Sequence, residues 1–382
     1  MIYLDHNATT PLAPASLQAL QTALEADYAN PASQHAAGRR AMAQLHAIRA
    51  RVREQLTPGV DTGHDRVIFT SGGTEANNLA IRGLAGQTPG RVIISALEHP
   101  CIRGAAEALG RDGFEIIELA AGADGRIDLD ALQKALTDDT RLVSVMHANH
   151  ETGVLQPVVE AAERCAKRGV PFHTDAVQSL GKVPLSFREL GVSAMTLSAH
   201  KFHGPRGIGA LLVRDRVELH PILFGGGQQL EMRPGTESVA LPVALEAALA
   251  WSLETLPPRA GEMAAQRDEF ERLVQEGVSE LVINGGDAPR LPNTSSLAFP
   301  GVDRQALLMA LDQQGVACST GSACASGSSE PSPVLLGMGC DPAIVDSSLR
   351  FSFGLKNRPG EARGGGRDRG PDRQKTPRLI PF

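Results

Sequence analysis

Short strand-like runs alternate with longer helical patterns over the first 250 residues or so, and this alternation most constrains the fold. The runs are rich in β-branched residues, whereas the segments between them carry apolar residues at helical spacing. Such alternation predicts a mostly parallel sheet with helices on both faces. The predicted strands are Val67–Thr70, Arg91–Ser95, Phe114–Leu119, Leu142–His147, Val170–Thr174, Ala194–Ser198 and Gly207–Val213. The clearest helices between them are Glu75–Leu84, Leu129–Leu136 and Pro157–Arg168.

A smaller α+β pattern follows two longer helical stretches, Leu241–Leu256 and Ala260–Val278. Its segments are Ser295–Phe299, Ala306–Gln313, Gly315–Ser319 and Ser348–Phe353. A chain of 382 residues is long enough for two domains, so we expect a large α/β domain and a smaller C-terminal one. The predicted division is 1–14 as an N-terminal segment joining the small domain, 15–256 as the large domain, 257–356 as the small domain and 357–382 as an atypical tail.

The tail differs in composition from the rest of the chain. It is rich in Gly, Pro and Arg, lacks an apolar period, and is basic in a chain whose net charge is −6. Such a composition buries too little apolar surface to order itself, so the tail is predicted to be disordered. A nucleic-acid- or partner-binding tail is the functional alternative, and its abrupt onset also suits a frameshift.

Bulk composition excludes several classes of protein. With 42% hydrophobic and 21% charged residues, the chain suits a soluble globular enzyme. No stretch approaches the roughly 20 apolar residues of a membrane span, and the opening MIYLDHNATTP does not resemble a secretory signal. The acidic charge gives no sign of nucleic-acid binding. Five cysteines without a CxxC pair argue against a disulfide framework or a zinc site, which predicts a reducing cytoplasm.

Lys201 lies at the exit of a predicted strand, 26 residues after Asp175. A strand-exit lysine, a strand-end aspartate and a glycine-rich turn upstream are what a pyridoxal phosphate (PLP) enzyme needs. The amine forms a Schiff base, and the carboxylate keeps the pyridine nitrogen protonated so that the ring acts as an electron sink. The pattern therefore predicts chemistry at the α-carbon of an amino acid, although Asp175 alone also suits a plain turn.

The segment Ser71–Thr74 reads as a tight turn between a strand and a helix. Its free amides and the Thr74 hydroxyl would bind a phosphate at the helix N-terminus. The alternative is an ordinary turn with capping residues. No lysine follows the glycines, so the segment is not a Walker loop.

His99 follows a predicted strand and precedes the helix that begins at Pro100. Its imidazole could stack on the pyridine ring and move protons near pH 7, and the alternative is a helix-entry histidine with a local hydrogen bond. Gln178 could reach the phenolic oxygen of the cofactor, and the phosphate is within reach of Ser198 and His200. Two further histidines carry no independent signal and are predicted to be structural: His173 and His203.

Cys324 lies in ACSTGSACASGSSEPS (317–332), where the composition is mostly Gly, Ser and Ala. Nothing around it would bury the thiol. Exposed thiols on such loops carry out nucleophilic sulfur chemistry when something lowers their pKa, and an incidental surface thiol is the alternative. Cys318 reads as a small core residue. The remaining cysteines lie in helical or turn contexts that predict no function: Cys101, Cys165 and Cys340.

Taken together, these segments resemble the cysteine desulfurases of the NifS/IscS type, which are PLP enzymes of aminotransferase fold type I in the class-V aminotransferase family. The resemblance spans about residues 2–356, with its motifs in the right order. The motifs are LDHNATTP (4–11), NPASQHAAGR (30–39), TSGGTEANN (70–78), EHP (98–100), ANHETGVLQP (148–157), HTDAVQ (173–178), SAHKFHGPRGIGAL (198–211), GGGQQLEMRPGTES (225–238), STGSACASG (319–327) and LRFSFG (349–354).

The resemblance implies roles for the residues around the predicted lysine. Lys201 would hold PLP covalently, Asp175 would pair with the pyridine nitrogen, and His99 would stack on the ring and shuttle protons. Gln178 would bond the phenolic oxygen. The implied phosphate ligands within the chain are Gly73, Thr74, Ser198 and His200.

Further roles concern the partner subunit, the substrate and the sulfur. Thr236 resembles the phosphate ligand that this family supplies from the partner subunit, which implies a homodimer with shared sites. Arg350 would clamp the substrate carboxylate bidentately, and Asn30 would assist. Cys324 falls on the sulfur-accepting nucleophile of the family. The implied reaction converts L-cysteine to L-alanine and leaves a persulfide on Cys324.

The persulfide would then pass to an acceptor protein, either an iron–sulfur scaffold or a tRNA-thiolation relay. No metal site is expected, and an iron–sulfur cluster would only be cargo that Cys324 contacts during transfer. We expect no membrane and no direct nucleic-acid partner. The alternatives are a selenocysteine lyase, another fold type I PLP enzyme such as an aminotransferase, and an impaired homologue that only binds partners. Transamination needs no thiol, so Cys324 argues against an aminotransferase.

Two features depart from the family pattern. His150, in ANHETG, stands where the family often has an asparagine that touches the cofactor oxygen. A histidine can still donate to that oxygen, so the resemblance implies tuning of the site. Similar proteins continue after the LRFSFG-like strand into an amphipathic helix, whereas here the tail follows.

Overall fold

A seven-stranded sheet forms the centre of the molecule, with strand order β2-β8-β7-β6-β5-β3-β4. The structure is a computed structural model and describes residues 1–26, 29–59, 64–321, 330–355 and 357. Four strand pairs are parallel, β3–β4, β3–β5, β5–β6 and β6–β7, and β8 runs antiparallel to both its neighbours. The mostly parallel sheet is therefore confirmed. The strands are β2 (Arg66–Thr70), β3 (Arg91–Ser95), β4 (Glu115–Leu119), β5 (Thr140–Ser144), β6 (Phe172–Asp175), β7 (Ala194–Ser198) and β8 (Gly209–Val213).

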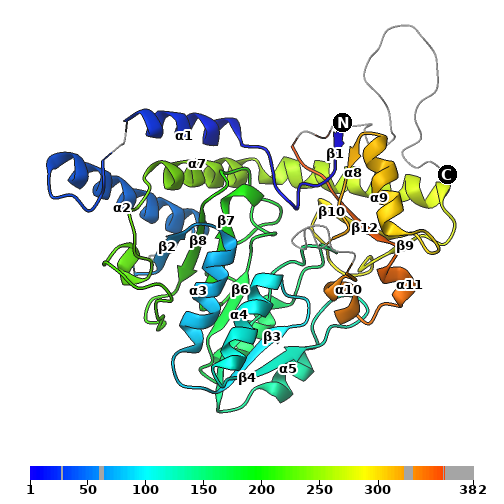
Figure 1. Cartoon of the computed structure of the whole chain (residues 1–382), viewed down its shortest axis with the longest axis horizontal. Helices are drawn as coiled ribbons and strands as arrows, with labels where there is room; N and C mark the ends of the chain where they lie inside the picture. Colours follow the sequence, from blue (N-terminus) through cyan, green and yellow to red (C-terminus); the bar gives the residue numbers. More distant parts are fainter. Residues whose placement is uncertain (27–28, 60–63, 322–329, 356, 358–382) are drawn as a thin grey trace, which may run out of the picture.

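Helices cover both faces of this sheet (Figure 1). Side chains alternate between the faces along each strand. In β2, Ile68 belongs to the core cluster that includes residues of α3 (Gly73–Ala85) and α4 (Pro100–Arg111). Its neighbours Val67 and Phe69 belong to the other cluster, which includes residues of α5 (Leu129–Ala135) and α6 (Val158–Ala166).

Two long N-terminal helices, α1 (Pro14–Ala26) and α2 (Ala36–Leu56), are additions to the predicted elements. The buried side of α2 includes Ala41, Leu45, Ile48 and Val52, an apolar stripe at helical spacing. Helix α1 lies along α7 (Ala240–Glu254), as Figure 1 shows. Helix α8 (Leu256–Gly277) continues from α7 towards the C-terminal elements.

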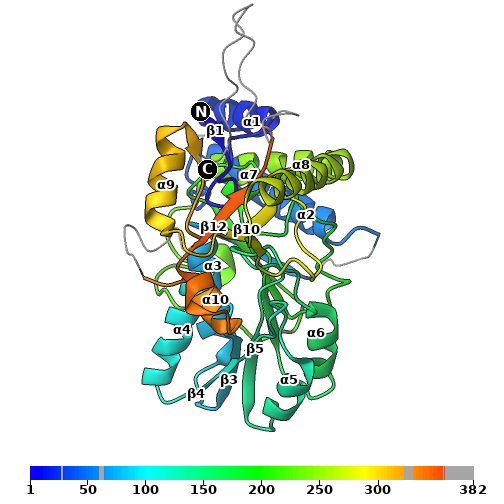
Figure 2. The same ribbon diagram turned by 90° about the vertical axis from the view of Figure 1, so that its right-hand side faces the viewer.

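The C-terminal elements form a smaller antiparallel sheet of order β12-β10-β9. Together with α8 and α9 (Arg304–Gln313), this sheet encloses its own core cluster. The N-terminus joins it, because β1 (Ile2–Tyr3) pairs in parallel with β11 (Val316–Ala317), beside α9 (Figure 2). The other elements are β9 (Val282–Ile283), β10 (Thr294–Ala298), α10 (Pro333–Gly337), α11 (Pro342–Val345) and β12 (Ser348–Ser352).

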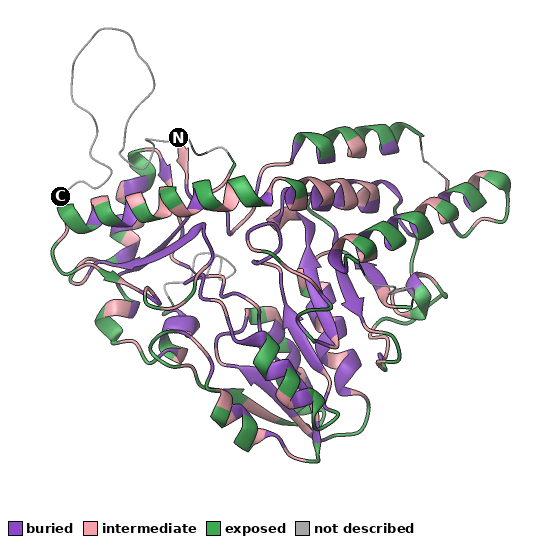
Figure 3. Cartoon of the chain, turned by 180° about the vertical axis from the view of Figure 1, so that it is seen from behind, coloured by how far each residue is buried: buried purple, intermediate pink, exposed green. Residues whose placement is uncertain are grey.

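Burial follows this layered arrangement. Figure 3 shows the strands of the large sheet mostly buried, whereas the outward sides of the helices are exposed. Within the described ranges, no helix is both long and apolar enough to cross a membrane. The tail residues 358–382 lie outside the described residues.

Candidate active site

A cavity of about 210 Å³ lies where β6 and β7 end and α3 and α4 begin. Ligands of open α/β sheets commonly bind at the carboxyl ends of the strands. Nine of the residues predicted from the sequence line it: Gly73, Thr74, His99, His150, Asp175, Gln178, Ser198, His200 and Lys201.

Lys201 ends a short 3₁₀ turn, η1 (Ala199–Lys201), that directly follows β7. Its Nζ donates to the backbone carbonyls of Asn7 at 2.5 Å and Ala8 at 2.9 Å. Two backbone carbonyls of the N-terminal segment, which are uncharged acceptors, thus hold the Lys201 amine at the wall of the cavity. An amine held in this way is well placed to bind a carbonyl group covalently.

Asp175 is the last residue of β6, and its carboxylate is buried. Oδ2 accepts a 2.7 Å hydrogen bond from Nδ2 of Asn77, and Oδ1 accepts a 2.9 Å bond from the backbone N–H of Val177. These donors orient the carboxylate in the cavity wall. Sequence reasoning missed Asn77, although it lies one helical turn after Gly73 in the TSGGTEANN motif.

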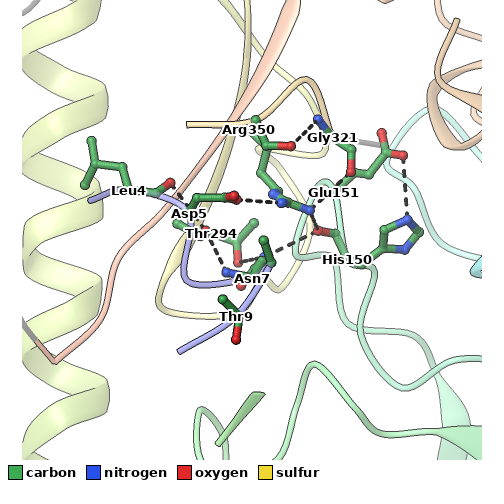
Figure 4. Close-up of polar contacts among 12 residues, drawn as sticks. Leu4, Asp5, Asn7, Thr9, His150, Glu151, Thr294, Gly321 and Arg350 are labelled. Carbon is green, nitrogen blue, oxygen red and sulfur yellow. Dashed lines mark hydrogen bonds and ion pairs between the residues drawn. The ribbon is translucent and has the colours of Figure 1, made fainter. Parts of the chain in front are cut away.

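Two imidazoles face one another at the cavity. The rings of His99 and His150 are edge-to-face, with centroids 5.4 Å apart. Burial lowers the pKa of His150 well below its ordinary value, and the nearby positive charges lower it further, so His150 is neutral at pH 7. Its Nε2 lies 3.6 Å from Oε1 of Glu151 (Figure 4).

The start of α3, in the wall of the same cavity, suits a phosphate. Helix α3 begins at Gly73, and a Cβ there would lie only 3.2 Å from Cγ2 of Val177 and 3.3 Å from Cβ of Ser198. A glycine therefore keeps the helix N-terminus open to an anion. Burial lowers the pKa of His200 to about 4, as does nearby Lys201 to a lesser degree, so His200 meets an anion as a neutral donor.

Asn7 connects several of these groups, and sequence reasoning assigned it no role. Its carbonyl accepts from Lys201 and from Nε2 of Gln178 at 3.0 Å. Its Oδ1 accepts from Nζ of Lys182 at 3.1 Å. Lys182 also donates to Oε1 of Gln178 at 2.7 Å, and burial lowers the pKa of this second lysine well below its ordinary value. Sequence reasoning also missed Lys182, and the one feature that could have pointed to it is its position four residues after Gln178.

A second cavity, of about 450 Å³, adjoins the first and shares His99, His150 and Lys201 with it. Arg350 of β12 lines it and is buried. Its Nη2 pairs with Asp5 at 2.8 Å, and Nη1 donates to the carbonyls of His150 and Gly321 (Figure 4). Its Nε has no hydrogen-bond partner among the described residues, which suits recognition of a carboxylate.

Other predicted residues stand apart. Asn30 and Thr236 are exposed and line neither cavity of their own chain. Cys324 lies outside the described residues, in the stretch 322–329. His173 bonds Ser144 and Thr196 and does not line either cavity. The same holds for His203, which bonds the Pro11 carbonyl.

The side chains present fit PLP. The first cavity combines an amine for the aldehyde, a carboxylate fixed by two donors, an imidazole at its wall and a glycine-opened helix N-terminus. These are the groups that the aldehyde, the pyridine nitrogen, the ring and the phosphate each require.

Comparisons with known proteins identify the family of the chain. The class-V aminotransferase family matches residues 2–362. The cysteine desulfurase IscS of Dictyoglomus turgidum is 39% identical over 93% of this chain and 90% of the relative. The IscS-like cysteine desulfurase of Mycobacterium tuberculosis is 38% identical over 93% of this chain and 91% of the relative.

Solved structures show the same architecture. A NifS-like protein from Rickettsia africae superposes with a TM-score of 0.85 at 30% identity, covering 95% of this chain and 96% of that one. SspA in complex with cysteine superposes with a TM-score of 0.80 at 32% identity, covering 92% of this chain and 98% of that one. The PLP fold type I architecture expected from the sequence is therefore confirmed.

Proposed function

Because this chain belongs to the class-V aminotransferase family, whose members are PLP-dependent enzymes, we propose that it is a cysteine desulfurase. It takes PLP as cofactor, converts L-cysteine to L-alanine and transfers the sulfur to an enzyme cysteine. One observation carries the proposal: Lys201, Asp175 and His99 converge on one cavity in a chain that is 39% identical to a curated cysteine desulfurase.

We assign each end of the cofactor to the side chains that suit it. Lys201 would bind the aldehyde, and Asp175, oriented by Asn77, would hold the positive charge of the pyridine nitrogen. His99 would stack on the ring, and both Gln178 and His150 would donate to the phenolic oxygen. When bound, PLP supplies a protonated ring that delocalises the electrons released at the α-carbon. The phosphate is assigned to Gly73, Thr74, Ser198 and His200.

The second cavity is assigned to the amino acid. Arg350 would bind the substrate carboxylate through its Nε, which has no hydrogen-bond partner in the described part of the chain, and through an adjacent Nη group. Asn30 is assigned a supporting contact on the family resemblance alone, since it lines neither cavity of its own chain. The contact with Arg350 aims the α-carbon at Lys201 and His99, which line the same cavity and move the α-proton. The thiolate of Cys324 then attacks the substrate sulfur. A new S–S bond forms as the C–S bond breaks, which leaves a persulfide on Cys324, and protonation of the carbon releases L-alanine.

The partners and the compartment are part of the same proposal. Thr236 is exposed and lines neither cavity of its own chain, which is consistent with a role in the partner's site of a homodimer. The persulfide passes to an acceptor protein, an iron–sulfur scaffold or a tRNA-thiolation relay. The IscS names of several relatives favour iron–sulfur assembly. We place the protein in the cytoplasm.

The substrate assignment is tested by product analysis. The PLP-loaded enzyme should release L-alanine from L-cysteine during steady-state turnover with a thiol reductant. Cys324→Ala should bind PLP normally and lose at least about 100-fold of this activity, because nucleophilic catalysis requires the thiol. Cys340→Ala is the matched control, since Cys340 lines neither cavity. Full activity of Cys324→Ala, or activity only with L-selenocysteine, would reject the assignment.

A further inference from the structure

Cys101 stands in the wall of the first cavity, although its sequence context gave it no functional signal. It is the second residue of α4, directly after Pro100, and the side chain of His99 caps this helix. The Nδ1 of His99 accepts the backbone N–H of Cys101 at 3.2 Å. The Sγ of Cys101 lies 2.9 Å from the same nitrogen.

Asn77 holds the other side of this thiol. Its Nδ2 donates to Sγ of Cys101 at 3.2 Å and to Oδ2 of Asp175 at 2.7 Å. A side-chain amide has two N–H hydrogens, so these two bonds use both. The sulfur therefore accepts from Asn77. Because the backbone N–H of Cys101 donates to Nδ1 of His99, that nitrogen is an acceptor, and the S–H proton of Cys101 points to it. A continuous chain joins Asp175, Asn77, Cys101 and His99.

This chain fixes the tautomer of the imidazole. A ring nitrogen that accepts hydrogen bonds carries no proton in the neutral imidazole, so the His99 proton resides on Nε2. Cys101 lines only the first cavity, whereas His99 lines both. Nδ1 of His99 thus contacts Cys101, which leaves Nε2 as the ring nitrogen that exchanges protons with the substrate.

We propose that Cys101 is a positioning residue and proton relay for His99. This inference rests on the proposed function only in that His99 exchanges protons with the substrate. When Nε2 gives its proton to the substrate carbon, the N–H bond breaks and the S–H proton of Cys101 moves to Nδ1. The imidazole stays neutral, and the thiolate left behind accepts the hydrogen bond from Asn77. The reverse transfer restores the thiol when His99 takes up a proton.

The other described thiols lack such partners. Burial raises the pKa of Cys165 to about 12, and burial likewise raises that of Cys318 to about 12. Neither lines either cavity. These two cysteines behave as small apolar residues. Cys101 differs because an imidazole and an amide both contact its sulfur.

Two variants separate a relay from a packing role. Cys101→Ala removes the proton, whereas Cys101→Ser keeps a hydroxyl that can accept from Asn77 and donate to His99. We expect Cys101→Ala to bind PLP fully, to keep its KM for L-cysteine and to lose roughly 10-fold in kcat with an altered pH profile. Cys101→Ser should recover most of that loss, and Cys340→Ala should match the wild type.

A second readout needs neither PLP nor turnover. In PLP-free protein with ¹⁵N-labelled histidine, the wild-type His99 should show an unprotonated Nδ1 and a protonated Nε2. In Cys101→Ala, the backbone N–H of residue 101 still donates to Nδ1, so the Nε2–H tautomer should persist, and the Nδ1 signal should shift because the S–H donor is lost. Failure of L-cysteine turnover in the wild type would reject the proposed function and leave this test intact.

Two results would overturn the relay. One is a Cys101→Ala enzyme with wild-type kcat, pH profile and His99 signals. The other is an equal loss of kcat and of PLP content in both Cys101 variants, because that pattern shows only support of the cavity wall.

Discussion

At the scale of single residues, two lysines lie near the cofactor cavity, and only one is placed to bind PLP. Nζ of Lys182 donates to the side chains of Asn7 and Gln178, and Lys182 does not line the first cavity. Lys201 does line it. We therefore propose different tasks for the two amines: Lys201 would bind the aldehyde, and Lys182 supports the side chain of Gln178.

Borohydride reduction tests this distinction. Reduction of the PLP-loaded enzyme, followed by peptide mass spectrometry, should place the cofactor on the peptide that contains Lys201. Lys201→Ala should lose this covalent label. A label on Lys182, or one retained in Lys201→Ala, would contradict the assignment.

The sequence predicted the cavity residues that sit inside ordered local motifs, such as Asp175 at a strand end and Lys201 at a strand exit. It did not predict Asn77 or Cys101, because their importance comes from contacts across the fold. Asn77 bonds a carboxylate 98 positions away. A cysteine at a helix start has no visible signal until the structure shows which side chains surround its sulfur.

At the scale of elements, the N-terminus of α3 is the predicted phosphate site. Gly73→Ala would add a Cβ 3.2 Å from Cγ2 of Val177 and 3.3 Å from Cβ of Ser198, so the helix start or its neighbours must shift. We expect PLP to bind roughly 10-fold more weakly, as measured by fluorescence titration of the PLP-free protein.

Gly104→Ala in α4 is the matched control, because a Cβ there meets no atom within 4 Å. It should leave PLP affinity unchanged. Equal affinities for the two variants would show that the start of α3 does not bind the phosphate.

His173 in strand β6 makes the stability of the folded protein depend on pH. Burial lowers the pKa of His173 to about 3, against an ordinary value of 6.5. Below pH 6.5 the unfolded chain takes up a proton that the folded protein cannot, so stability falls as pH falls towards 3. At pH 5 this contributes about 2 kcal/mol of destabilisation.

Urea unfolding at pH 7.5 and pH 5 checks this value. Between pH 7.5 and pH 5, the free energy of unfolding of the wild type should fall by about 2 kcal/mol more than that of His173→Asn, because the variant has no imidazole at this position. His46→Asn, at an exposed position of α2, is the control, and its free energy of unfolding should fall as much as that of the wild type. Equal losses for all three proteins would contradict the prediction.

Element boundaries show where the sequence pattern suffices. The predicted strands Arg91–Ser95 and Ala194–Ser198 match β3 and β7. The predicted strand Leu142–His147 differs from β5, which covers Thr140–Ser144. Val145 and Met146 are buried beyond the end of the strand, and apolar runs report burial rather than pairing.

At the scale of the whole molecule, the two sheets meet around the active site through the N-terminal segment. Asn7 bonds Lys201 on one side and Thr294 of β10 on the other. The pairing of β1 with β11 follows from contacts between chain ends, which periodicity does not reveal. A homodimer would add Thr236 to each site.

Mixed dimers test the shared site. One chain carries Lys201→Ala and the other carries Thr236→Ala. If Thr236 acts in the partner's site, the chain with intact Lys201 receives an intact Thr236, so the mixed dimer should have one site with wild-type PLP affinity. If that site binds PLP as weakly as a Thr236→Ala homodimer, then Thr236 does not act across the interface.

The most direct test of the central claim is a single turnover of the PLP-loaded enzyme with ³⁵S-labelled L-cysteine, without reductant or acceptor. L-alanine is quantified, and the labelled sulfur is located by peptide mass spectrometry. The account predicts one L-alanine for each sulfur retained, with that sulfur as a persulfide on Cys324. L-alanine without protein-bound sulfur, or sulfur on Cys101 in place of Cys324, would contradict it.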